Sequence, residues 1–115
     1  MAKILLLDDE DQTRRVIALH LGKRGHEVIT GKDGAEGLDL LARQRFDLVL
    51  SDLRMPHVTG MELLKSIRDQ GLLTPVIVLT AFASIESAVE AMKLGANDYI
   101  GKPPQLDEIE IKVNN

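Results

Sequence analysis

Short runs of apolar residues recur along the chain, and segments with helical spacing of apolar residues lie between them. Three of these runs are almost continuously apolar rather than alternating: Ile4–Leu7, Phe46–Leu50 and Val76–Leu79. Strands of a parallel sheet have this composition when helices cover both faces. A fourth run, Asp98–Ile100, and a weaker one, Glu27–Thr30, complete a set of five predicted strands.

Helix signals occupy the intervals between the predicted strands. Asp33 and Glu36 predict a capping box at the start of one helix, and Pro103-Pro104 is predicted to begin the last one. Glycines are predicted to end three helices, at Gly25, Gly71 and Gly95. Strands that alternate with helices over 115 residues predict five β/α units, with a parallel sheet covered on both faces.

Polar residues follow four of the predicted strands. Ligands of open α/β sheets bind beyond the carboxyl ends of the strands, so residues at those ends are the first candidates for a site. They are Asp8 and Asp9 after the first strand, Asp52 after the third, Thr80 after the fourth and Lys102 after the fifth. We therefore expect these five side chains to converge at one edge of the sheet.

Three carboxylates at one sheet edge repel one another unless a cation lies among them. Two carboxylates ~4 Å apart near a protein surface repel by about 4 kcal/mol. Because the ligands are all oxygens, with no cysteine in the chain, they suit a hard ion such as Mg²⁺. Lys102 and the Thr80 hydroxyl can bind an anionic group such as a phosphoryl, and an aspartate carboxylate can itself attack phosphorus.

Composition narrows the function classes. The net charge is −4, and the aromatic residues are only Phe46, Phe82 and Tyr99, so direct nucleic-acid binding is not expected. No apolar stretch approaches the ~18 residues of a membrane span, and the first predicted strand leaves no room for a signal peptide. A single cytoplasmic domain over residues 1–115 is therefore expected.

Four motifs, in order and across essentially the whole chain, resemble the receiver domain of two-component response regulators: ILLLDDE, DLVLSDLRMP, PVIVLTAFAS and ANDYIGKP. The longer stretches DLRMPHVTGMELL and TAFASIESAVEAMKLGANDYIGKP most resemble receivers that control AAA+ transcriptional activators. The resemblance implies a flavodoxin-like (βα)5 fold, which is a doubly wound parallel sheet with strand order 2-1-3-4-5.

The same resemblance implies the chemistry of the site. Asp52 is expected to accept a phosphoryl group from a sensor histidine kinase or a phosphotransfer protein. Asp9, Asp52 and the backbone carbonyl of Arg54 are expected to ligate Mg²⁺, with Mn²⁺ as a substitute, and Asp8 to act mainly through water. The domain would be a phosphoacceptor that assists its own phosphorylation and slow dephosphorylation, rather than an enzyme acting on separate substrates.

A conformational switch is also implied by the resemblance. Thr80 and Lys102 are expected to bind the phosphoryl oxygens, and Tyr99 to rotate inward as the Thr80 hydroxyl is drawn to the site. This remodels the face formed by the fourth helix, fifth strand and fifth helix. That face is expected to contact a second copy of the chain or a covalently linked output domain that activates transcription.

The sequence departs from the usual receiver pattern at a few positions, and other positions bear on the lifetime of the phosphorylated state. Pro104 stands where the family usually has an aromatic or bulky residue, and the last helix is expected to be truncated at Asn115, with the output domain absent. The Lys102-Pro103 bond is implied to be cis. Arg54 and Phe82 lie two positions after Asp52 and Thr80, where members of the family that the chain resembles control the access of water to the phosphorylated aspartate. Both are large here, so the resemblance implies a long-lived phosphorylated state.

Two other functions remain open from the sequence. The stretch DEDQT (9–13) matches the signature of haloacid-dehalogenase-type phosphohydrolases, in which Asp9 would be the nucleophile and Asp11 the acid/base. A receiver-like module that binds proteins without being phosphorylated is the other alternative. In the receiver interpretation, Glu10 and Asp11 only begin a helix. His20, His26 and His57 have no metal-ligand spacing and are given surface or packing roles.

Overall fold

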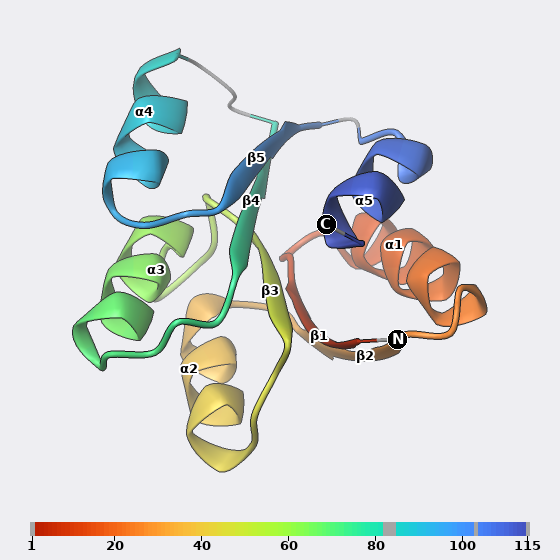
Figure 1. Ribbon diagram of the computed structural model, residues 1–115, viewed down its shortest axis with the longest axis horizontal. Helices are drawn as coiled ribbons and strands as arrows, with labels where there is room; N and C mark the ends of the chain where they lie inside the picture. The colour runs from red at the N-terminus through yellow and green to blue at the C-terminus, as the bar shows by residue number, and fades with distance from the viewer. Residues whose placement is uncertain (1, 82–84, 103, 115) are drawn as a thin grey trace.

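A single sheet of parallel strands runs through the protein in the order β2-β1-β3-β4-β5. The computed structural model describes residues 2–81, 85–102 and 104–114, and Figure 1 shows the sheet at the centre. The strands are β1 (Lys3–Leu7), β2 (Glu27–Gly31), β3 (Leu48–Asp52), β4 (Val76–Thr80) and β5 (Asp98–Gly101). The predicted strand order and parallel arrangement are confirmed.

Helices cover both faces of this sheet, as predicted. In Figure 1, α1 and α5 lie on one face, whereas α2, α3 and α4 lie on the other. The helices are α1 (Asp11–Lys23), α2 (Gly34–Arg43), α3 (Gly60–Asp69), α4 (Ile85–Lys93) and α5 (Leu106–Val113). Each helix follows the strand of the same number, so every loop from a strand to a helix opens at the same edge of the sheet.

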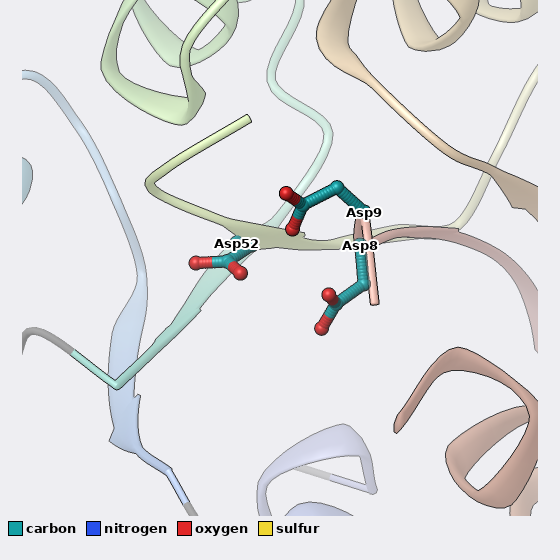
Figure 2. A group of neighbouring side chains, drawn as sticks. All are labelled: Asp8, Asp9 and Asp52. Carbon is teal, nitrogen blue, oxygen red and sulfur yellow. The ribbon is translucent and has the colours of Figure 1, made fainter. Parts of the chain in front are cut away.

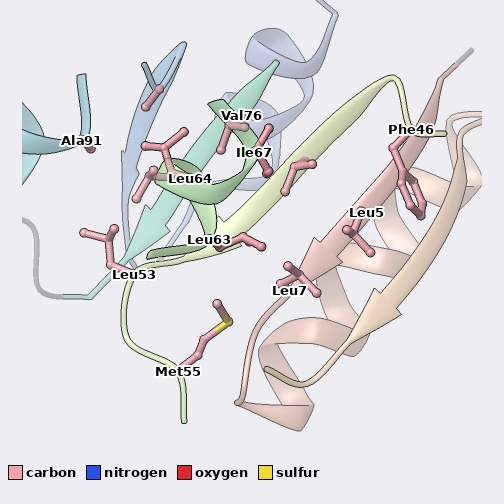
Figure 3. Close-up of a cluster of buried hydrophobic side chains, with 13 residues drawn as sticks. Leu5, Leu7, Phe46, Leu53, Met55, Leu63, Leu64, Ile67, Val76 and Ala91 are labelled. Atoms are coloured by element: carbon pink, nitrogen blue, oxygen red, sulfur yellow. The ribbon is translucent and has the colours of Figure 1, made fainter. Parts of the chain in front are cut away.

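The continuous apolar runs contribute to two cores. In β1, Leu5 and Leu7 pack with the α2, α3 and α4 side of the sheet, as Figure 3 shows, whereas Ile4 and Leu6 pack with the α1 and α5 side. All four side chains are fully buried. Successive residues of a strand point to opposite faces, so a strand buried on both faces is apolar at every position.

Two elements begin two or more residues later than predicted. The strand predicted over Phe46–Leu50 is β3, which instead spans Leu48–Asp52. Phe46 is buried but packs into the core from the segment before the strand, so its apolar character does not place it in the sheet. The last helix begins at Leu106 and not at the prolines, since Gln105 is the N-cap residue and has an extended backbone.

Helix ends follow local chemistry. Asp33 accepts a hydrogen bond from the Glu36 backbone N–H at 2.8 Å and so caps α2, although these two residues do not form the reciprocal bond of the predicted capping box. A complete capping box, not predicted, is formed at the start of α3 by Thr59 and Glu62. The predicted glycine stops of α1, α3 and α4 are confirmed by the positive φ angles of Gly25, Gly71 and Gly95, at 93°, 78° and 104°.

Candidate functional site

Three aspartates meet at the carboxyl edge of the sheet, between the ends of β1 and β3. Asp8 and Asp9 directly follow β1, and Asp52 is the last residue of β3. One carboxylate oxygen from each of the three lies within 4.8 Å of the others. In Figure 2 the side chains of Asp9 and Asp52 point toward the same space. The predicted convergence of these carboxylates is thus confirmed.

Strand register explains why residues distant in sequence meet here. Leu7 pairs with Ser51, so Asp8 and Asp52 each come next along neighbouring strands. Thr80 pairs with Gly101, so Lys102, the residue after β5, lies beside the end of β4. The Lys102 backbone N–H donates to the Thr80 carbonyl at 2.9 Å and extends this pairing by one bond. The parallel ladder therefore aligns the ends of four strands at one site.

Lys102 carries the positive charge of the site. Its Nζ donates hydrogen bonds to Asp52 Oδ2 at 2.9 Å and to Glu10 Oε1 at 3.0 Å. Asp8 Oδ2 lies 2.7 Å from the same Nζ as an ion pair. The Lys102 side chain is only 6% exposed, so these contacts replace its hydration.

Burial and neighbouring charges shift the pKa values of Asp8 and Lys102. Burial of the Asp8 carboxyl raises its pKa, since the contacts with Lys102 and the Glu10 backbone N–H only partly oppose desolvation. Burial by itself would lower the pKa of Lys102. The contacts with Asp8, Asp52 and Glu10 outweigh that effect, raise the pKa, and keep the ammonium charged.

The arrangement fits a divalent cation with oxygen ligands. Asp8 and Asp52 are buried, whereas Asp9 is exposed beside an open depression lined by Asp9, Arg54, Met55, Pro56 and Thr59. The Arg54 backbone N–H donates to Asp52 Oδ1 at 3.3 Å, which brings this loop against the same carboxylate. Lys102 forms ion pairs with Asp8 and Asp52 of this cluster, so the three carboxylates together keep negative charge that a hard cation can neutralise.

The loop between β3 and α3 is shaped by close backbone approaches. The Gly60 N–H donates to the Leu53 carbonyl at 2.9 Å, and a Cβ at Gly60 would lie 2.1 Å from the Asp52 carbonyl oxygen. His57 adopts a positive φ of 69°, which is costly for a non-glycine residue. His57 therefore lies at a strained position of this loop.

Thr80 and Tyr99, the two residues predicted to form a switch, lie on the neighbouring strands β4 and β5. Thr80 is fully buried at the end of β4. Tyr99 is half-buried in β5, and its hydroxyl shares a hydrogen bond of 3.0 Å with the Ser87 hydroxyl of α4. Tyr99 thus links the sheet to α4. Phe82 and Pro103, to which adduct lifetime and a cis bond were assigned, lie outside the described residues.

Glu10 has a contact that local sequence patterns do not reveal. Asp11 lies in the first turn of α1, as expected for an acid near a helix start. Glu10 is the N-cap residue but makes no cap hydrogen bond, and its carboxylate instead contacts Lys102. The prediction that Glu10 only begins a helix is therefore wrong. The two residues are 92 positions apart, so only the tertiary fold joins them.

Comparison with known proteins decides the family. Residues 4–114 match the model of the response regulator receiver domain. The chain belongs to the response regulator receiver domain family. In this receiver domain only three residues separate the end of β1 at Leu7 from the start of α1 at Asp11, which leaves no room for the hairpin flap of the phosphohydrolase alternative. Phosphorylation of an aspartate is the general function of the family.

Curated relatives are longer than this receiver domain. It is 42% identical over 111 residues to the Escherichia coli regulatory protein AtoC, covering 96% of this chain and 24% of the relative. It is 39% identical over 110 residues to the uncharacterized transcriptional regulatory protein YkoG of Bacillus subtilis, covering 96% of this chain and 48% of the relative. The chain therefore spans about a quarter of the length of the first relative and about half of the length of the second.

Solved receiver structures have the same fold. The receiver domain of Francisella response regulator 1452 matches with a TM-score of 0.95 and 36% identity, covering 99% of this chain and 94% of that one. The Vibrio cholerae chemotaxis protein CheY4 matches with a TM-score of 0.93 and 34% identity, over 99% and 97% of the two chains. Within the described part of this receiver domain, no helix is long and apolar enough to cross a membrane.

Asp8→Asn is expected to stabilise the metal-free receiver domain at neutral pH by on the order of 1 kcal/mol. Because the folded-state pKa of Asp8 is raised, its ionised form weakens folding once the pH rises through that pKa. The gain should therefore disappear below the ordinary value of 3.8, where both states are protonated. Urea denaturation at several pH values measures it.

The matched control for this prediction is Asp39→Asn, which removes an exposed acid paired with Arg43 on α2. It should change the free energy of unfolding by less than about 0.5 kcal/mol at every pH. A loss of stability in metal-free Asp8→Asn at pH 7 would show that the Lys102 contact outweighs the burial of the Asp8 charge.

Proposed function

We propose that Asp52 is the phosphoacceptor of this receiver domain. The donor would be the phosphohistidine of a sensor histidine kinase or of a phosphotransfer protein. The observation that carries the proposal is the position of Asp52 at the end of β3. There its two oxygens meet different partners, Lys102 on one side and the Arg54 N–H on the other.

The chain's own residues can carry out the transfer. An Asp52 oxygen attacks phosphorus, the new O–P bond forms, and the imidazole leaves with the electrons of the broken N–P bond. Lys102 offers positive charge to the phosphoryl oxygens, and Thr80 offers a hydroxyl. Asp9, Asp52 and the Arg54 carbonyl would hold Mg²⁺ or Mn²⁺, with Asp8 acting through water. The bound cation would supply positive charge for the transferring group.

Phosphorylation would act as a switch through Thr80 and Tyr99. A phosphorylated side chain carries roughly 1.5–2 negative charges, which can draw the Thr80 hydroxyl and Lys102 toward it. Tyr99 would then exchange its contact with Ser87 for an inward position, changing how α4 lies on β5. We infer that the face of α4, β5 and α5 transmits this change by shifting a pre-existing equilibrium.

The biological setting is a further part of the proposal. Residues 1–115 would form one cytoplasmic receiver domain of a longer regulator, joined to an output domain that activates transcription. The greater length of the transcriptional relatives supports this setting, and the motif resemblance favours an output domain of the AAA+ class. The receiver would act as a signalling domain, through its kinase, its output domain or a second copy, and not by binding nucleic acid itself.

Labelling by a small phosphodonor tests this function. The wild-type protein, incubated with acetyl phosphate and Mg²⁺, is expected to take up one phosphoryl group, measured as a mass increase of the intact protein. Excess EDTA should reduce the labelling rate by at least about 100-fold, because the acidic cluster then repels the anionic donor. A protein that stays unlabelled with Mg²⁺ would instead be a non-phosphorylated interaction module.

A further inference from the structure

Glu10 approaches Lys102 from the solvent side of the site. Its Oε1 lies 3.0 Å from Nζ, and its side chain is 61% exposed, whereas that of Lys102 is 6% exposed. The other two acids that contact Nζ, Asp8 and Asp52, are 0% and 7% exposed in their side chains. Glu10 is thus the one solvent-accessible member of the three acids around the ammonium.

The backbone of Glu10 holds its carboxylate at this place. The Glu10 N–H donates to Asp8 Oδ1 at 2.9 Å, and its φ and ψ of −85° and 110° are those of an extended N-cap residue. A side chain at an N-cap position commonly accepts a hydrogen bond from the first turn of its helix. Glu10 makes no such bond, and its carboxylate is directed to Lys102 instead.

Three acids surround the ammonium of Lys102. Its Nζ donates hydrogen bonds to Asp52 and Glu10, and Asp8 Oδ2 lies 2.7 Å away as an ion pair. A phosphoryl oxygen that binds Lys102 therefore competes with these partners. Exposed ion pairs are weak and are screened by salt, whereas buried ones are screened far less. Glu10 is the partner that gives way most easily.

We infer that Glu10 is a positioning residue that holds Lys102 in the unphosphorylated site and slows phosphorylation by anionic donors. This inference rests on the proposed role of Asp52. Before transfer, the Glu10 carboxylate occupies a donor of Lys102 and repels the incoming phosphate. With acetyl phosphate, the Asp52 oxygen forms the new bond to phosphorus, and acetate leaves with the electrons of the broken O–P bond.

Glu10→Gln tests the inference, because the amide keeps the shape of the side chain and removes its charge. Its phosphorylation by acetyl phosphate with Mg²⁺ is expected to be about three- to tenfold faster than that of the wild type at low salt. The gain should shrink as the salt concentration rises. It should also be smaller with phosphoramidate, which carries less negative charge at neutral pH than acetyl phosphate.

Asp11→Asn is the matched control. It removes one negative charge from the neighbouring residue, whose carboxylate pairs with Arg14 and not with Lys102. It is expected to change the rate by less than twofold. Equal rates for Glu10→Gln and wild type, or equal gains in both variants, would overturn the role of Glu10 while the labelled wild type leaves that of Asp52 intact. An unlabelled wild type would overturn both.

Discussion

Asp52→Asn is expected to reduce labelling by acetyl phosphate more than about 100-fold, because the amide is not a nucleophile toward phosphorus. The side chain keeps its shape and can still accept the Arg54 N–H, which donates to Oδ1. Loss of labelling would therefore reflect chemistry and not a collapsed site. Intact-protein mass spectrometry over a time course with Mg²⁺ gives the rate.

Two controls support this interpretation. Asp69→Asn removes an exposed acid that pairs with Lys65 on α3, and it should be labelled at the wild-type rate. The thermal unfolding of Asp52→Asn should be as cooperative as that of the wild type, which shows that the variant is folded. Wild-type labelling of folded Asp52→Asn would contradict the assignment of Asp52 as the acceptor.

Gly60→Ala is expected to lower the free energy of unfolding by about 3 kcal/mol or more. A Cβ at this position would lie 2.1 Å from the Asp52 carbonyl oxygen and 2.7 Å from the Leu53 Cα. Both neighbours belong to the backbone, so no side-chain rotation relieves the overlap. The loop between β3 and α3 would have to move, together with the Asp52 end of the strand. Urea denaturation measures the loss.

Gly22→Ala is the matched control for this substitution. Gly22 lies within α1, and a Cβ there would meet no atom within 4 Å. This variant should gain about 0.5–1 kcal/mol, since alanine favours the helix and restricts the unfolded chain. If Gly60→Ala were as stable as the wild type, the close approach of Gly60 to the end of β3 would not be needed for folding.

Much of the fold was predictable because the relevant signals are local. A strand buried on both faces is apolar at every position, which made β1, β3 and β4 visible in the sequence. Because the strands were predicted to be parallel, their carboxyl ends had to lie at one edge of the sheet, and this alone predicted that Asp52 and Lys102 are close together. Both ends of β3 were predicted two residues too early. At these ends the apolar run in the sequence does not coincide with the residues whose backbones pair in the sheet.

Contacts between distant side chains could not be predicted in this way. The ion pair between Glu10 and Lys102 depends on how closely the loops that carry these residues approach each other, and neither loop has a sequence pattern that predicts this contact. Arg68 is a second example. From α3 it donates to the carbonyls of Leu72, Thr74 and Gly95, and so ties together the segments that precede β4 and β5. As a basic residue on a helix of mixed charge, it gave no signal in the sequence.

The position of the phosphoryl group is the most direct test of the central claim. Wild-type protein labelled with acetyl phosphate and Mg²⁺ is digested at low pH, and the modified residue is identified by tandem mass spectrometry. The account predicts a single phosphoryl group on Asp52, in the sequence DLVLSDLRMP. A phosphoryl group on Asp9, or on any residue other than Asp52, would contradict it.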